Sequence, residues 1–426
     1  KEKRFSLRFV RWRNLFNHIK NNIMSDDVFV TGLGIISAIG TGVEESLFTL
    51  KSSVSKIGEI KHLKTAHHDI PCAEVPFSDE ALKRKLGIGE NEVVTRAALL
   101  GIKAAREAFE SAKLHKVKEL GLKIGFINGT TVGGMEKSEQ YYLDFINPDT
   151  RNYSDYIEPH QCGTCTETIT DYLLDFDFIT TISTACSSAL NSIILGANVL
   201  RTKQLDCVIV GGTECLTKFH LNGFNTLMIL DSERCKPFDD ERAGLNLGEG
   251  GAYLVIENEK SVKLRGGVPI CKITGWGNSC DAFHQTASSP NGEGAVLSMR
   301  KALKMSNLRG GDIDYINAHG TGTPNNDESE GVALMELFGE DVPPISSTKS
   351  FTGHTTSAAG GVESVIAILA LQHNFIPPNL HFKNKMSKLS FSPVTKLKEN
   401  VVINNVLNNS FGFGGNNSSI IFSKIR

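Results

Sequence analysis

One cysteine of this 426-residue chain lies where it could act as a nucleophile. Cys186 follows the small residues 183–185 and precedes a segment, 187–202, whose apolar spacing predicts a helix. Free backbone N–H groups and the positive end of a helix stabilise a thiolate and lower its pKa. A free cysteine is also often a buried structural residue, and its position alone leaves both interpretations open.

Two histidines, a lysine and a glutamate further along the chain could assist such a nucleophile. His319 follows a predicted strand, 313–316, and enters a loop rich in Gly and Thr. His354 comes five residues after Lys349, just before a segment of small residues that contains Glu363. A loop histidine can exchange a proton near neutral pH but is commonly a surface residue. A pair between Glu363 and Lys349 could equally be a solvated ion pair of little energetic value.

The motifs for nucleotide and metal binding are incomplete. The segment 32–37, GLGIIS, follows a predicted strand but lacks the last glycine of the dinucleotide motif, and the chain has no G-K-[S/T]. Cys162 and Cys165 form a C-x-x-C without a second pair at zinc spacing. We therefore expect no cofactor and no metal.

Composition narrows the functional classes. The 45 basic and 47 acidic residues give a net charge of -2, so nothing favours nucleic acid as a partner. We find no apolar run long enough to span a membrane, and the nine scattered cysteines favour a reducing, cytoplasmic location. Residues 1–23 are strongly basic and precede Met24. We interpret them as an N-terminal extension that is either mobile or not native, although apolar residues at helical spacing also fit a basic amphipathic helix.

Beyond Met24, short β-branched runs alternate with longer helical patterns, which predicts an α/β architecture with largely parallel sheets covered on both faces. Strands are expected over 28–30, 123–127, 207–210, 252–256, 271–274, 313–316 and 419–422. Helices are expected over 95–112, 187–202, 295–305 and 362–372.

Four landmarks occur twice in the same order, which indicates an internal duplication. The matching pairs of segments are 30–34 with 273–277, 128–130 with 317–321, 183–186 with 347–349, and 248–251 with 412–415. We predict two halves, 24–265 and 266–426, with an irregular insert around 137–180 in the first. Such halves usually share one core and place the site on the seam between them.

The segments that carry these residues resemble the elongating β-ketoacyl-acyl-carrier-protein synthases. The resembling segments are 183–189 (STACSSA), 317–323 (NAHGTGT), 347–350 (STKS) with 353–354 (GH), and 409–416 (NSFGFGGN). The resemblance runs from about Val28 to the C-terminus. It implies the thiolase fold, with five layers in the order αβαβα and two pseudo-repeated halves, and usually a homodimer.

The resemblance also implies a role for each motif residue. Cys186 corresponds to the acyl-accepting nucleophile, and the N–H groups of Cys186 and Phe413 to its oxyanion hole. His319 and His354 correspond to the residues that bind the malonyl thioester and stabilise the enolate left by loss of carbon dioxide. The reaction is a decarboxylative condensation that gives a 3-oxoacyl-acyl-carrier-protein two carbons longer.

Further positions match supporting roles in the family. Lys349 and Glu363 match residues that orient the histidines. The matched binding positions are Thr321 and Thr323 for the phosphopantetheine arm, Val132 and Phe224 for the acyl pocket, and Phe413 as a gate over the cysteine.

Departures from the family pattern bear on substrate and partner. Met228 stands where many relatives carry a carrier-docking arginine, and Ala243 stands where the family commonly has an acid before the glycine. The basic run 83–85 could instead meet an acidic carrier. A specialised polyene or polyketide-like pathway is therefore as well supported as fatty-acid elongation. The expected partners are an acyl carrier protein and a second copy of the chain. The alternative is a subunit of a heterodimeric condensing enzyme that mainly controls chain length or supports its partner.

Overall fold

The computed structural model describes residues 27–146 and 158–425, so the predicted extension 1–23 lies outside the described residues. Ten described strands form one sheet in the order β3-β2-β4-β5-β1-β6-β12-β11-β7-β8. They are β1 (Val28–Ser37), β2 (Ile124–Gly129), β3 (Phe178–Ile182), β4 (Cys207–Glu214), β5 (Gly250–Glu257), β6 (Cys271–Cys280), β7 (Tyr315–Asn317), β8 (Ile345–Ser346), β11 (Asn405–Gly412) and β12 (Asn416–Ser423). A separate pair is formed by β9 (Phe375–Ile376) and β10 (Lys398–Glu399).

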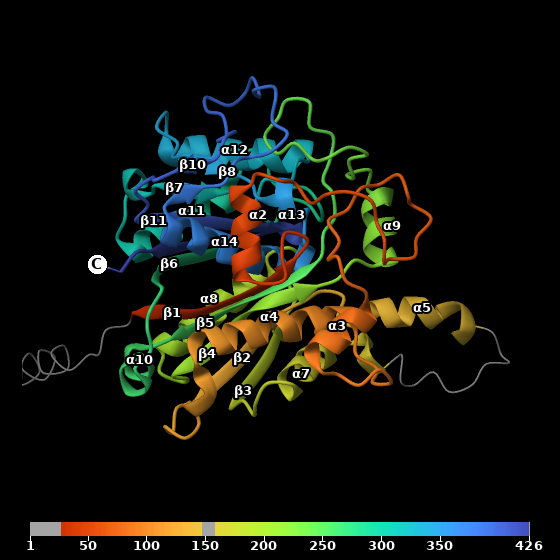
Figure 1. The fold of residues 1–426 in the computed structure, drawn as a ribbon. Coiled ribbons are helices and arrows are strands. Elements are labelled where there is room, and N and C mark those ends of the chain that lie inside the picture. Colours follow the sequence, from red (N-terminus) through yellow and green to blue (C-terminus); the bar gives the residue numbers. More distant parts are fainter. Residues whose placement is uncertain (1–26, 147–157, 426) are drawn as a thin grey trace, which may run out of the picture.

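Helices cover both faces of this sheet (Figure 1). The α-helices are α2 (Val43–Lys51), α3 (Asp79–Leu86), α4 (Arg96–Ala112), α5 (Met135–Phe145), α7 (Cys162–Asp171), α8 (Ser188–Arg201), α9 (Lys218–Thr226), α10 (Glu259–Arg265), α11 (Glu293–Ser306), α12 (Pro324–Phe338), α13 (Lys349–Thr352) and α14 (Ala359–His373). Short 3₁₀ turns lie at η1 (Leu114–Lys116), η2 (Glu158–His160), η3 (Gly310–Asp312), η4 (Thr356–Ala358) and η5 (Phe413–Gly415).

The two halves of the sheet repeat one strand order. From its outer edge the first half runs β3-β2-β4-β5-β1, and from the opposite edge the second runs β8-β7-β11-β12-β6. Strands β1, β2, β3, β4 and β5 of the first half correspond, in chain order, to β6, β7, β8, β11 and β12 of the second. With this correspondence the two orders are identical. The halves meet where β1 pairs with β6 over 28–30 and 271–273. The division of the chain at residue 265 stays a prediction.

The layers follow from which helix packs on which half. Helix α4 packs on β1 and β5, α11 packs on β6 and β12, and α8 and α14 pack against each other between the halves. Figure 1 shows this stack, with most of the first half below the second. Residues 359–371 of α14 are all buried, as expected for a helix that is apolar on every side. The predicted αβαβα thiolase fold is thus confirmed.

The glycines of the repeated segment at the start of each half have a packing role. A Cβ at Gly34 would lie 2.0 Å from the carbonyl oxygen of Ala104 in α4. A Cβ at Gly277 would lie 2.1 Å from the carbonyl oxygen of Ser298 in α11. These glycines let the outer helix approach the strand backbone, so the incomplete dinucleotide motif reflects close packing.

Two predictions about the elements were wrong. The sheet is mixed, since four of its neighbouring pairs are parallel and five are antiparallel among the described strands. Strands covered on both faces look alike in sequence whichever way they run. The described parts of the segment 137–180 are also not irregular: they include most of α5, all of α7 and the first residues of the edge strand β3.

Candidate active site

Cys186 lies in a tight turn between β3 and α8. The preceding Ala185 has a φ of 52°, a left-handed conformation that is uncommon for any residue except glycine. The cysteine is only 6% exposed and the backbone of Gly412, at the end of β11, approaches it from the other half. A Cβ at Gly412 would lie 2.9 Å from the Thr184 carbonyl oxygen and 3.1 Å from the Cys186 nitrogen. The motif around Gly412 therefore requires glycine for this contact between halves.

The position of this thiol near the start of a helix does not give it a low pKa. Burial raises the pKa of Cys186 to about 11, although the charge of Lys349 and the backbone N–H groups of Phe413 and Cys186 oppose that shift. The helix starts two residues later, at Ser188, and the free-energy cost of burying a thiolate exceeds the help from these groups. The resting residue is therefore a neutral thiol with N–H donors and a lysine around it.

His319, Lys349 and Glu363 form a buried polar cluster. The Lys349 Nζ lies 3.1 Å from Nδ1 of His319, donates to the His319 carbonyl oxygen at 2.6 Å, and pairs with the Glu363 carboxylate. Because an ammonium group only donates, Nδ1 of His319 accepts and its proton lies on Nε2. Burial raises the pKa of Glu363 to about 7, against the lowering effect of Lys349.

His354 lies next to His319, with the two ring centroids 5.4 Å apart and nearly perpendicular. Its backbone N–H donates to Asn246 and its carbonyl accepts from Gly248, so residues of the first half hold it in place. Burial, together with the nearby Lys349 charge, holds the pKa of both histidines well below the usual value. Both imidazoles are neutral at pH 7, as the chemistry inferred from the sequence requires.

A cavity of about 340 Å³ joins these residues. Of the residues singled out in the sequence, it is lined by Cys186, Phe224, Met228, Ala243, His319, Thr321, Thr323, His354 and Phe413. Phe224 stacks on Phe413 with centroids 5.7 Å apart, and the hydroxyls of Thr321 and Thr323 hydrogen-bond to each other at 2.8 Å. Lys349 and Glu363 do not line this cavity.

Val132 does not line the cavity either. It is buried on the loop 130–132. This loop is held by the carboxylate of Glu214, a fully buried residue at the end of β4. Glu214 accepts hydrogen bonds from Thr130 Oγ1 at 3.0 Å, from the backbone N–H of Thr131 at 2.8 Å, and from Ser357 of the second half at 2.5 Å. The acyl-pocket role assigned to Val132 stays a prediction.

Two carboxylates that the sequence reasoning missed hold the His319 loop. Glu330 accepts the backbone N–H groups of His319 and Gly320 at 2.9 and 2.8 Å. Asp327 accepts those of Thr321 and Gly322 at 2.9 and 3.1 Å. Both residues are buried in α12, whose first residue is a proline. An acid such as Asp327 in the first turn after a proline is a common helix-start signal, and Glu330 follows within the same helix, so neither residue carries a sequence sign of this function.

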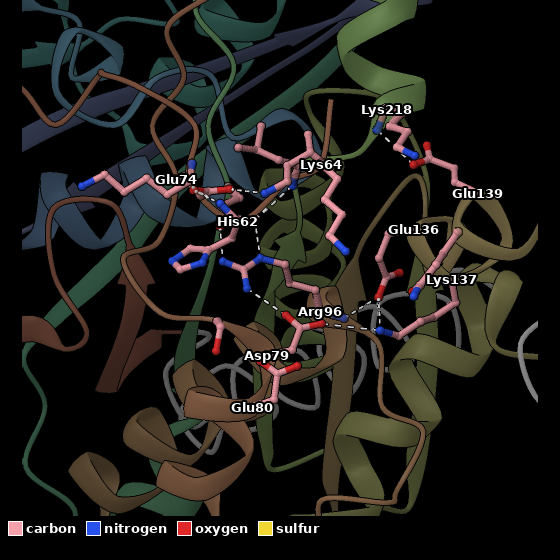
Figure 2. Close-up of a pocket in the computed structure, with 16 residues that line it drawn as sticks. His62, Lys64, Glu74, Asp79, Glu80, Arg96, Glu136, Lys137, Glu139 and Lys218 are labelled. Carbon is pink, nitrogen blue, oxygen red and sulfur yellow. Dashed lines mark hydrogen bonds and ion pairs between the residues drawn. The ribbon is translucent and has the colours of Figure 1, made fainter. Parts of the chain in front are cut away.

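A second cavity of about 650 Å³, shown in Figure 2, reaches the start of α9. The Cys186 cavity is lined by the other end of this helix. The lining of the second cavity is charged, with Arg96 at the centre of an ion network. The Arg96 guanidinium donates to Glu249 and Asp79 and to the carbonyls of Phe77 and Val75. These bonds engage every guanidinium nitrogen, so we interpret the network as structural.

Among the described residues, no three His, Cys, Asp or Glu side chains lie together so that they could hold a metal ion. Within the same residues, every helix is too short or too polar to cross a membrane.

Sequence comparisons match the chain over nearly its whole length. The family model described as "Beta-ketoacyl synthase, N-terminal domain" matches residues 25–261, and the corresponding C-terminal domain matches residues 270–383. A protein named 3-oxoacyl-[acyl-carrier-protein] synthase 2 from Coxiella burnetii is 31% identical over 410 residues, which cover 93% of this chain and 98% of that protein. One of the same name from Vibrio harveyi is 30% identical with the same coverage.

Solved structures agree with the sequence matches. The ishigamide ketosynthase/chain length factor superposes with a TM-score of 0.88 at 29% identity, covering 94% of this chain and 99% of that one. A ketosynthase (ApeO) in complex with its chain length factor (ApeC) from Xenorhabdus doucetiae gives 0.83 at 28% identity, covering 94% and 98%.

Proposed function

Since the chain belongs to the β-ketoacyl synthase family, we propose that the Cys186 cavity is where it carries out its condensation. The enzyme is an acyltransferase that joins an acyl group to malonyl-acyl-carrier-protein with loss of carbon dioxide. The observation that supports this placement most directly is that one cavity contains a thiol and two neutral imidazoles.

The first step loads the cysteine. The sulfur of Cys186 attacks the acyl thioester of a carrier, and the carrier thiol leaves with the proton that the cysteine gives up. The N–H groups of Cys186 and Phe413 bind the oxyanion of the tetrahedral intermediate, which matches their effect on the thiol. Phe413, stacked on Phe224 at the cavity wall, acts as the gate for the incoming chain.

The second step makes the carbon nucleophile. The malonyl carboxylate leaves as carbon dioxide, and the electron pair of the broken bond moves onto the thioester as an enolate. Nε2–H of His319 donates to that oxygen, since Lys349 occupies Nδ1, and His354 supplies the other donor. Neutral imidazoles suit this role because the step needs hydrogen-bond donors and no base.

The third step forms the product. The enolate carbon attacks the acyl-Cys186 carbonyl, the C–S bond breaks, and the sulfur takes up a proton from solvent water. The product is a 3-oxoacyl-acyl-carrier-protein two carbons longer. Thr321 and Thr323, which line the cavity, hold the phosphopantetheine arm. The resemblance assigns Val132 to the acyl pocket, although it does not line this cavity.

Separate assays of the two half-reactions test these roles. We expect Cys186→Ala to abolish acyl transfer to the protein but to retain release of carbon dioxide from a malonyl carrier. His319→Ala and His354→Ala should each slow that release by about 100- to 1,000-fold, the usual cost of one such donor. A stable acyl-enzyme in Cys186→Ala, or wild-type release in both histidine variants, would show that the roles are misassigned.

A carrier protein and a second subunit are the proposed partners, without nucleic acid. We favour a homodimer. The names of two solved structures, each pairing a ketosynthase with a chain length factor, support the heterodimer alternative. This chain retains Cys186, His319 and His354, which argues for the active role in either assembly. Its pathway, fatty-acid elongation or polyene or polyketide-like synthesis, and its cytoplasmic location stay predictions.

A further inference from the structure

A cluster of uncharged polar side chains lies between the start of α8 and the 3₁₀ turn η5. Its central atom is Oδ1 of Asn416, the first residue of β12, which directly follows that turn. This oxygen accepts from Nδ2 of Asn191 in α8 and from Nδ2 of Asn278 in β6, each at 2.9 Å. Oγ of Ser187, the residue after the nucleophile, lies 2.8 Å from the same oxygen. Hydrogen-bonding groups from three segments thus meet at one amide carbonyl.

Local structure explains this placement. Alternate residues of a strand share a face, so Asn416 and Ser418 of β12 point the same way. Ser418 is the partner of Asn278 in the register of β12 and β6, and Nδ2 of Asn278 lies 3.0 Å from its hydroxyl oxygen. Residues four apart at the start of a helix also share a face, which places Ser187 beside Asn191. The cluster therefore joins two strands of the second half to the helix that follows the nucleophile in the first half.

The other polar groups of the cluster have partners too. Oδ1 of Asn191 accepts from Nδ2 of Asn278 at 2.9 Å and from the Ser418 hydroxyl at 2.8 Å. Nδ2 of Asn191 also lies 2.9 Å from Oγ1 of Thr184. A network whose members satisfy one another holds them in a single arrangement. Removing the Asn416 carbonyl would leave several of these donors without their acceptor, which is costly where water has little access.

The two N–H groups proposed for the oxyanion hole come from segments far apart in the chain. The N–H of Cys186 belongs to the turn before α8, and the N–H of Phe413 belongs to η5, between β11 and β12. Before η5, the Ser410 hydroxyl donates to the Cys186 carbonyl at 3.0 Å. Within η5, Gly414 has a φ of 81°, and a Cβ there would meet no atom within 4 Å. Asn416 therefore provides the attachment on the far side of a turn that has open space around it.

We propose that Asn416 is a positioning residue for the acylation of Cys186. Its side chain holds the N–H of Phe413 at the separation from the N–H of Cys186 that an oxyanion requires. The inference rests on the proposed function, in which these two groups bind the oxyanion. Such donors must lie about 2.7–3.1 Å from the developing charge, so a small shift of one segment weakens the stabilisation. Loss of carbon dioxide uses the imidazoles of His319 and His354 and should not depend on Asn416.

Asn416→Leu tests this role when the half-reactions are measured separately. We expect the maximal rate of acyl transfer to Cys186 to fall by at least about tenfold with little change in KM, because only the transition state loses an interaction. Release of carbon dioxide from a malonyl carrier should change by less than about twofold. The matched control is Asn198→Leu. Asn198 of α8 accepts from Nε1 of Trp276 in β6 at 3.2 Å, so it joins the same two elements further from the nucleophile and should affect neither half-reaction.

Two further measurements separate positioning from stability. Alkylation of Cys186 by iodoacetamide forms no oxyanion, so its rate in Asn416→Leu should fall much less than the rate of acyl transfer. Asn191→Leu removes one donor to the same carbonyl and should show the same selective loss. The double variant should lose much less than the product of the two single losses, because both changes remove one shared hydrogen bond.

Several results would overturn the inference. Wild-type acyl transfer in Asn416→Leu would do so, as would equal losses of both half-reactions or the same loss in Asn198→Leu, which would assign Asn416 to the fold alone. If Asn416→Leu does not fold, Asn191→Leu decides by the same criteria. Failure of the proposed function looks different, since the wild type would then form no acyl-Cys186.

Discussion

At the scale of single residues, the protein keeps its nucleophile and its imidazoles uncharged. The same burial that holds the pKa of His319 and His354 far below normal raises the pKa of Cys186 to about 11. Each shift favours the neutral form because charge is costly in this interior. The site therefore depends on donors that act while charge develops during the reaction.

The thiol can be titrated directly. Because a raised pKa leaves only a small thiolate fraction at pH 7, the alkylation rate of Cys186 by iodoacetamide should rise about tenfold per pH unit between pH 7 and 10. Mass spectrometry of the modified peptides follows Cys186 separately from the exposed Cys280, which is the internal control. A plateau of the Cys186 rate below about pH 9 would contradict the raised pKa.

At the scale of elements, α12 positions the His319 loop through buried carboxylates. The two oxygens of Glu330 accept the N–H groups of His319 and Gly320, and Oε1 also takes Asn409 Nδ2 at 3.2 Å. Both backbone groups that face this carboxylate are N–H donors. An amide in its place would therefore point its own NH₂ group at one of these N–H groups, and that hydrogen bond would be lost. The geometry of the imidazole thus depends on a helix that does not itself line the reacting end of the cavity.

Glu330→Gln should therefore separate the half-reactions. We expect release of carbon dioxide to fall by at least about tenfold, because one lost donor position costs several kcal/mol at such sites. Acylation of Cys186 should change much less. Glu328→Gln on the same helix, whose carboxylate pairs with Lys388 at the surface, is the matched control. Equal losses of both half-reactions and of melting temperature would assign Glu330 to the fold instead.

At the scale of the whole molecule, the ten-stranded sheet leaves β3 at one edge. Phe178 and Ile179 of this strand are 38% and 41% exposed. An edge strand carries backbone groups free to pair, and exposed apolar side chains beside them favour a second chain there. This edge is where we expect a subunit to join.

Native mass spectrometry of the purified chain tests that expectation. A homodimer with condensing activity of its own is the predicted result, and Ile179→Lys should shift the protein toward monomer by adding charge at the interface. Val268→Lys, at another site exposed by 78%, controls for the added charge. A monomer that gains activity only with a second, different subunit would favour the heterodimeric alternative.

Much of this protein was predictable from local patterns. The expected helices over 95–112, 187–202, 295–305 and 362–372 correspond to α4, α8, α11 and α14, and the repeated landmarks occupy equivalent places in the two halves. Periodicity and turn residues act between neighbours in the chain, so they can be read without the fold. The motif residues Cys186, His319 and His354 do line one cavity, as their place in the resemblance implied.

Other properties were decided only by tertiary structure. Whether a thiol is a thiolate depends on burial and on charges distant in sequence, such as Lys349 beside Cys186. The anchoring of His319 by Glu330 and the mixed direction of the strands depend equally on which segments meet in space. Local sequence determines which residues are available, whereas long-range packing sets their solvation and partners, and through these their chemistry.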